Sequence, residues 1–133
     1  MADRKKELLA AARKARRKAY APYSNFRVGA AVLGGDGRVY SGCNVENSSF
    51  GLTICAERNA IFGMVAAGVR EIREVLVIGE TAESLPPCGA CRQVMAEFAA
   101  PGVVVHMCTK AGASTDATVG ELVPHLFHLK TGR

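Results

Sequence analysis

The sequence predicts an α/β fold, a three-layer α/β/α sandwich built around a mixed β-sheet. Two observations predict it: an apolar hairpin in the first third of the chain, and a regular alternation of helix and strand after it. The chain has 133 residues, of which 49% are hydrophobic, which suits one domain with a substantial core. We therefore expect a single domain over residues 1–133.

The N-terminal segment predicts a basic helix over about residues 3–19. Leu8, Ala12, Ala15 and Ala19 recur at helical spacing on one stripe, and lysines and arginines occupy the opposite face. The first 18 residues hold eight of the 17 cations of a chain whose formal net charge is +5. Such a face can contact nucleic acid or an anionic surface, but it is more often simply solvated, which is the interpretation favoured here.

A hairpin and a polar loop follow this helix. Residues 26–33 and 38–43 predict two antiparallel strands, and the glycine-rich residues 34–37 predict the turn between them. Residues 44–53 are rich in Asn, Ser and Gly and predict a loop. Because this loop leads directly into the first cysteine motif, we expect it to bind a ligand.

The second half of the chain predicts two helices that alternate with two strands. The strands are apolar and rich in β-branched residues, as expected of buried strands. Pro101 and Gly102 predict the end of the second helix. The predicted elements are, in order, a helix over residues 55–67, a strand over 72–79, a helix over 88–99 and a strand over 103–108.

Two short motifs bring together three thiols and a carboxylate. Cys55 and Glu57 stand at the start of one predicted helix, and Cys88 and Cys91 at the start of the next. Three thiolates can bind zinc and leave a fourth position open for water or substrate, which is the arrangement of a catalytic site. Zinc makes its bound water more acidic, and a carboxylate that is not a ligand can carry the proton. Helix N-termini also favour thiolates.

The cysteines allow two other interpretations. Cys88 and Cys91 alone resemble a redox pair at a helix start, but a redox pair gives no role to Cys55 or Glu57. A purely structural zinc would need a fourth ligand, for which Cys43 and Cys108 are the candidates. Both lie in predicted strands, where a buried free cysteine is the more common situation. The open catalytic site is therefore favoured.

The two motifs together resemble those of the zinc nucleoside deaminases, specifically the short, homotetrameric, all-cysteine cytidine deaminases of the cytidine and deoxycytidylate deaminase superfamily. The resemblance covers most of residues 20–127. It implies Zn²⁺ held by the three motif cysteines, attack of a zinc-bound hydroxide on C4 of cytosine, and Glu57 as proton carrier. Further matching segments are Phe-Arg-Val-Gly-Ala-Ala at residues 26–31, Gly-Cys-Asn-Val-Glu-Asn at 42–47 and Gly-Leu-Thr-Ile at 51–54.

The resemblance also implies the residues that bind the nucleoside. Asn44 and Glu46 would hydrogen-bond the ribose, Phe26 would pack beside the pyrimidine, and Ala56 would belong to the same substrate site. For Phe26, an ordinary core position is nearly as good an interpretation. For Asn44 the alternative is a turn residue, although the acid at position 46 is harder to explain in that way.

Other residues of the resemblance concern the metal charge and the assembly. Arg58 would compensate the negative charge of three thiolates by hydrogen-bonding the sulfurs, and Arg92 would either share this role or be solvated. Phe127 would cover a site in a neighbouring subunit of a homotetramer, and the loop with Ser48 and Phe50 would also reach across. The family commonly has alanine where Ser48 stands and tyrosine where Phe50 stands, and the missing tyrosine hydroxyl would remove one hydrogen bond that the resemblance allows at the subunit contact.

We therefore expect zinc-dependent hydrolytic deamination of cytidine and deoxycytidine to uridine and deoxyuridine, in pyrimidine salvage. Alternatives are a related deaminase acting on blasticidin S or a modified pyrimidine and, from a different class, an RNA-binding protein with a structural zinc. No segment is typical of a membrane span or signal peptide, and five cysteines suit a reducing compartment, so we expect a cytoplasmic protein without membrane or nucleic-acid partners. His106, His125 and His128 fit no motif and are interpreted as structural.

Overall fold

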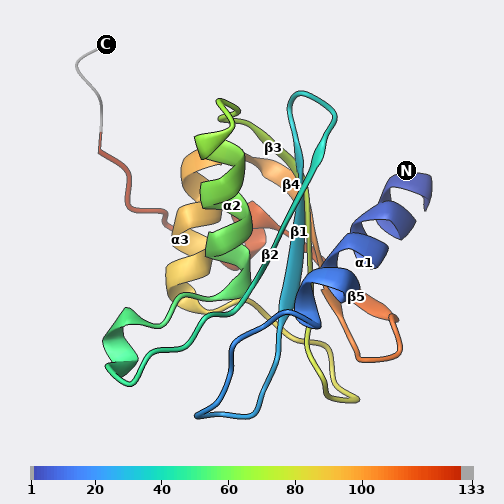
Figure 1. The fold of residues 1–133 in the computed structure, drawn as a ribbon. Coiled ribbons are helices and arrows are strands. Elements are labelled where there is room, and N and C mark those ends of the chain that lie inside the picture. The colour runs from blue at the N-terminus through green and yellow to red at the C-terminus, as the bar shows by residue number, and fades with distance from the viewer. Residues whose placement is uncertain (1, 130–133) are drawn as a thin grey trace.

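The computed structural model describes residues 2–129 and shows a five-stranded mixed sheet in the order β2-β1-β3-β4-β5. Helix α1 (Ala2–Arg16) covers one face of the sheet, and α2 (Ala56–Ala66) and α3 (Gly89–Phe98) cover the other (Figure 1). The predicted α/β/α sandwich is confirmed. Within the described residues, no helix has the length and apolar character needed to cross a membrane.

Strands β1 (Gly29–Gly34) and β2 (Val39–Cys43) form the predicted hairpin, with Gly29 opposite Cys43. The first strand begins at residue 29 and not at the predicted residue 26, because the side chain of Asn44 forms hydrogen bonds with the backbone of Phe26 and Val28. Its Oδ1 accepts from the Val28 amide at 2.8 Å, and its Nδ2 donates to the Phe26 carbonyl at 2.9 Å. The residues before β1 are therefore held by Asn44, through its side chain and through its backbone amide, which donates to the Val28 carbonyl at 3.3 Å.

Strand β3 (Ile72–Ile78) is the centre of the sheet. It pairs antiparallel with β1 and parallel with β4 (Ala99–Cys108), which it reaches through α3. Helix α3 ends at Phe98, within one residue of the predicted end at Ala99, but the strand that follows begins at Ala99 and not at residue 103 as predicted. The chain is already extended at Ala99, which pairs with Ile72, and a register shift before Glu74 accommodates the early start.

Two elements near the C-terminus complete the sheet and its cover. Strand β5 (Ser114–Thr118) pairs antiparallel with β4 and was not predicted, because its sequence Ser-Thr-Asp-Ala-Thr lacks an apolar alternation. Helix α4 (Val119–Leu122) begins with a capping box between Thr118 and Glu121.

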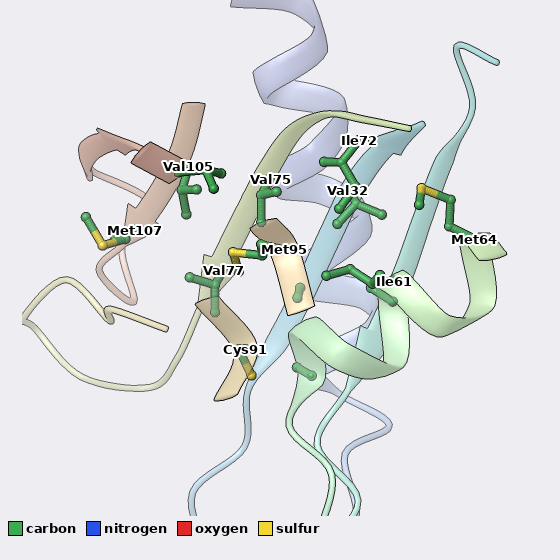
Figure 2. Close-up of a cluster of buried hydrophobic side chains, with 14 residues drawn as sticks. Val32, Ile61, Met64, Ile72, Val75, Val77, Cys91, Met95, Val105 and Met107 are labelled. Atoms are coloured by element: carbon green, nitrogen blue, oxygen red, sulfur yellow. The ribbon is translucent and has the colours of Figure 1, made fainter. Parts of the chain in front are cut away.

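The core lies on both faces of the sheet because successive residues of a strand point to opposite sides. In β3, Val75 and Val77 belong to the cluster under α2 and α3, whereas Leu76 and Ile78 pack toward α1. Figure 2 shows the first cluster, in which Cys91 lies among the apolar side chains. One of the motif cysteines is thus anchored directly in the core.

Helix α1 is attached to the sheet by its apolar stripe and by part of its basic face. Leu8 and Ala12 are fully buried, and a Cβ added to Gly29 would lie 1.9 Å from the Ala12 carbonyl oxygen, so helix and strand are in close contact. The expected solvated face is only partly observed, because four of the cations hydrogen-bond loops and strands of the sheet. These are Arg4 to the Gly37 carbonyl, Lys5 to the Ser114 hydroxyl, Arg13 to the Ala111 carbonyl and Arg16 to the Gly79 carbonyl.

Candidate metal centre and active site

The candidate centre lies where the first turns of α2 and α3 meet. Cys55 is the N-cap of α2 and Cys88 the N-cap of α3, and both have extended backbone conformations. Cys91 follows in the first turn of α3 and is fully buried. Neither N-cap side chain caps its own helix, so both sulfurs remain available to a ligand.

The three sulfur atoms are arranged as a metal ion would require. All three lie within 4.8 Å of one another, with Cys55 Sγ 3.8 Å from Cys88 Sγ and Cys88 Sγ 3.4 Å from Cys91 Sγ. In a tetrahedral site with zinc–sulfur bonds of about 2.3 Å, the sulfurs are about 3.8 Å apart. The spacing and the donor type therefore fit zinc, with three protein ligands.

The protonation of the thiols supports the same conclusion. A hydrogen bond with Cys91 lowers the pKa of Cys55 to about 5, with a further contribution from Arg58 and against the effect of burial. The same contact with Cys55, together with burial, raises the pKa of Cys91. The hydrogen bond thus stabilises the thiolate of Cys55 and keeps Cys91 protonated. Ionisation of all three needs a cation between them.

Glu57 lies in the first turn of α2 and is almost completely buried, with 4% of its surface exposed. Burial raises its pKa to about 7, and the charge of Cys55 adds to this effect, while its hydrogen bonds and Arg58 oppose it. A carboxyl group with a pKa near 7 can both accept and donate a proton at neutral pH. The arrangement can therefore perform general acid–base chemistry beside the three sulfurs.

Arg58 lies on the sulfur cluster. Its Nη2 donates to Cys55 Sγ at 3.4 Å, and this hydrogen bond raises the pKa of the guanidinium against the effect of burial. Its Nε is buried and has no hydrogen-bond partner within residues 2–129. Arg92, the other cation considered for this role, directs its guanidinium to the carbonyls of Pro87 and Leu122 instead.

The residues implied to bind the ribose also organise the loops around the site. Asn44 is buried and holds the backbone of Phe26 and Val28, as described above. Glu46 Oε1 accepts from the amides of Tyr23 and Ser24 at 3.0 and 3.1 Å, and its Oε2 accepts from the Ser24 hydroxyl. The hydrogen bond from the Ser24 hydroxyl is the main cause that lowers the pKa of Glu46.

A pocket of about 340 Å³ lies beside this loop. Of its lining, Glu46, Phe50 and Thr53 belong to the loop of residues 44–53 that was expected to bind a ligand, whereas Tyr23 and Ser24 were not expected. The sulfurs do not line this pocket. Of the residues that do, Thr53 is the nearest along the sequence to a motif cysteine, two positions before Cys55. Tyr23 and Ser24 precede β1, and no pattern in the sequence indicated that they would face residues 46–53.

The remaining implied residues differ widely in exposure. Ala56 is fully buried at the start of α2, and Phe26 packs its ring so close to Gly79 that a Cβ there would lie 2.9 Å from Cζ. Ser48 is exposed, and 76% of Phe50 and 69% of Phe127 are exposed.

Cys43 and Cys108 lie apart from the three-sulfur cluster, in β2 and β4. Burial raises the pKa of both thiols, as it does for cysteines in apolar surroundings.

The fold and the site together define a zinc-binding domain of the deaminase type, with an open three-cysteine centre beside a buried carboxyl group.

Comparison with known proteins agrees with this class. The model of the cytidine and deoxycytidylate deaminase zinc-binding region matches residues 2–107. The chain is 46% identical over 121 residues to a cytidine deaminase of Sporosarcina psychrophila, covering 91% of this chain and 89% of the relative. The crystal structure of a cytidine deaminase from Burkholderia pseudomallei has a TM-score of 0.87 and 49% identity, with 92% and 98% of the two chains covered. The chain belongs to the cytidine and deoxycytidylate deaminase family.

Proposed function

We propose that this protein hydrolyses cytidine and deoxycytidine to uridine and deoxyuridine, with release of ammonia. The observation that carries the proposal is the position of Glu57, a buried carboxyl group with a raised pKa beside three clustered thiols. The cytidine deaminases among its relatives support the choice of substrate. Such a reaction would serve pyrimidine salvage.

The chain's own residues account for the steps of the reaction. Zinc held by Cys55, Cys88 and Cys91 would lower the pKa of a bound water molecule and so supply a nucleophile for C4 of the cytosine ring. Glu57 accepts one proton of the attacking water and delivers it to N3 of the ring, and then carries the second proton from the new hydroxyl group on C4 to the exocyclic amino group, which leaves as ammonia. Arg58 places a positive charge on Cys55 and offsets the charge of the thiolates.

The loops would orient the nucleoside. Asn44 and Glu46 present an amide and a carboxylate to ribose hydroxyls, and both are held by hydrogen bonds to the neighbouring backbone. Phe26, fixed against Gly79, would pack beside the pyrimidine, with Ala56 at the base of the site. Groups fixed in this way lose little freedom when the substrate binds.

Several features favour a free nucleoside over a polynucleotide. An ionised Glu46 repels a phosphate on the ribose, and hydrogen bonds already lower the pKa of this carboxyl group. Four of the cations on α1 are engaged with the sheet and its loops, as described above. A site for single-stranded nucleic acid would instead combine a basic groove with stacked aromatic side chains.

We also propose that the active form is a homotetramer in the cytoplasm. Phe50 and Phe127 are large apolar side chains left mostly exposed, which supports a role in covering the site of a neighbouring subunit, with Ser48 in the same loop. Thiols that must stay reduced to bind zinc suit a reducing compartment. We also propose that residues 1–133 form one deaminase domain.

The test is to incubate the purified protein with cytidine, with blasticidin S and with a cytosine-containing single-stranded oligonucleotide, at equal cytosine concentration, and to follow ammonia release. We expect cytidine to be converted and the oligonucleotide to remain unchanged. Turnover of blasticidin S alone would reassign the substrate within the family. Turnover of the oligonucleotide with inert cytidine would contradict the proposal and favour a nucleic-acid substrate.

A further inference from the structure

The C-terminal segment is attached to the metal-binding helix by two successive side chains of α3. Arg92 Nη1 donates to the carbonyl oxygen of Leu122 at 3.3 Å, and Gln93 Nε2 donates to the carbonyl oxygen of Phe127 at 3.0 Å. Leu122 is the last residue of α4, and Phe127 follows it by five positions. Both ends of residues 122–127 are therefore fastened to the helix that carries Cys91.

Arg92 makes a second hydrogen bond on its other side. Its Nε donates to the Pro87 carbonyl oxygen at 2.8 Å, and Pro87 is buried and directly precedes Cys88. Arg92 itself directly follows Cys91. Its side chain thus folds back over the turn that presents two of the three sulfurs, and the same guanidinium reaches the end of α4.

The geometry explains why this position would need arginine. A guanidinium is planar and offers donors in fixed directions, so one group can hold two carbonyls at once, whereas a lysine offers a single flexible nitrogen. The last carbonyls of a helix lack partners within the helix, and a cation there is also favourable for the helix dipole. Arg92 meets both needs at Leu122 while it holds Pro87.

We propose that Arg92 is a positioning residue that couples the docked segment 122–127 to the metal-binding turn of residues 87–91. Docking of the segment keeps the Pro87 carbonyl, and with it Cys88 and Cys91, in the arrangement that binds zinc. The inference rests on the proposed role of the cysteines. It differs from the role of Arg58, which contacts a sulfur directly, whereas Arg92 acts through the backbone.

The test uses the full-length zinc protein and two measurements other than activity. The first is the rate of zinc transfer to a chromogenic chelator, and the second is hydrogen exchange of peptides that cover residues 83–92 and 119–129. We expect Arg92→Lys and Arg92→Gln to release zinc about 10-fold faster or more, since loss of groups that support metal ligands typically weakens binding by about 10 to 100-fold. Exchange should rise in both peptides.

Two further variants sharpen the result. Gln93→Ala releases the segment at Phe127 without touching Pro87, so coupling predicts faster exchange of residues 119–129 together with faster zinc release, smaller than for Arg92→Lys. Arg70→Lys is the matched control, because Arg70 is exposed and precedes β3, at the other end of the strand that leads toward the site. We expect it to behave as the wild type in both measurements.

Three outcomes would overturn the role of Arg92: unchanged zinc release in the Arg92 variants, wild-type behaviour of Arg92→Lys, or faster zinc release without faster exchange of residues 119–129. Faster exchange of this segment in Gln93→Ala with wild-type zinc release would also contradict the coupling. A wild-type protein that binds no zinc would contradict the proposed function itself, and is distinguishable because it is measured before any variant.

Discussion

Arg58 donates a hydrogen bond from Nη2 to Sγ of Cys55, and so places a full positive charge on the sulfur cluster. The arginine is held by the first turn of α2, the same turn that buries Glu57. In the proposed mechanism, charge compensation and proton transfer would therefore depend on adjacent residues of one helix, so we expect a change in one residue to alter the chemistry of the other.

Replacement of Arg58 tests this relationship. We expect Arg58→Gln to bind zinc and fold, but to lower kcat roughly tenfold, as a hydrogen bond to a charged group is lost. The acidic limb of the pH–rate profile should move to higher pH, because uncompensated thiolates disfavour loss of the proton from the attacking water. The rate and pH profile for cytidine provide the measurement. An unchanged profile and rate would show that Arg58 has no part in the chemistry.

The metal site was predictable because its signals are local. Cys88 and Cys91 are three positions apart at a helix start, so their sulfurs face the same way, and Cys55 opens the preceding helix. Helices α2 and α3 begin and end within one residue of their predicted bounds, whereas α1 ends at Arg16, three residues before its predicted end. A spacing within a helix and the start of a helix are properties of neighbouring residues, which a sequence shows directly.

Long-range polar contacts could not be predicted in the same way. The side chain of Asn44 replaces strand pairing for Val28, and Arg92 reaches Leu122, 30 positions away. Strand β5 has little apolar character of its own and is extended because β4 offers it an edge. Such features depend on which segments come into contact in the folded chain, and no local pattern in the sequence predicts them.

Gly42 allows the close contact between β2 and the start of α2. A Cβ at this position would lie 2.5 Å from the Ala60 amide nitrogen and 2.8 Å from the Ala56 carbonyl oxygen. We expect Gly42→Ala to lower the free energy of unfolding by roughly 1–3 kcal/mol, because backbone atoms must move. Urea unfolding provides the measurement.

Gly63, in the same helix α2, is the control for this substitution because a Cβ there would meet nothing within 4 Å. Gly63→Ala should stabilise the protein slightly, by about 0.5–1 kcal/mol, since glycine disfavours helix. Equal effects of the two substitutions would contradict the contact between β2 and α2.

Asp116 gives a pH-dependent contribution to stability. Its Oδ1 lies 2.9 Å from His106 Nδ1, and Nε2 of the same ring contacts Glu74, so His106 joins β3, β4 and β5. Although partial burial opposes it, hydrogen bonds from His106 and Ser114 lower the pKa of Asp116 below 3.8. A carboxyl group whose pKa is lower in the folded state stabilises the fold at pH values above its pKa in the unfolded chain. This contribution is lost as the pH falls through its pKa in the folded state.

We therefore expect Asp116→Asn to be less stable than the wild type near pH 6, and the difference to shrink as the pH falls below about 3.8. The comparison is made by urea unfolding at a series of pH values, with Glu97→Gln as a control on the exposed surface of α3. A difference between wild type and Asp116→Asn that stays constant over this range would show that the charge of Asp116 does not contribute.

Glu46 offers a test of nucleoside binding. Its carboxylate is held by Tyr23 and Ser24, and glutamine would lose the negative charge and one acceptor. We expect Glu46→Gln to raise KM for cytidine roughly tenfold with a smaller effect on kcat, since the proposed contact is to the ribose, away from the reacting atoms. Steady-state kinetics gives the two values. A loss in kcat at constant KM would place Glu46 in the chemical step.

The most direct test of the account is the Glu57→Gln variant, assayed for zinc content and for cytidine turnover in the same preparation. Glu57 is not one of the three clustered ligands, so we expect the variant to retain zinc and the fold. Turnover should fall by about 100-fold or more, the usual contribution of a general acid and base. Full zinc content with turnover close to that of the wild type would contradict the role of Glu57 and with it the proposed mechanism.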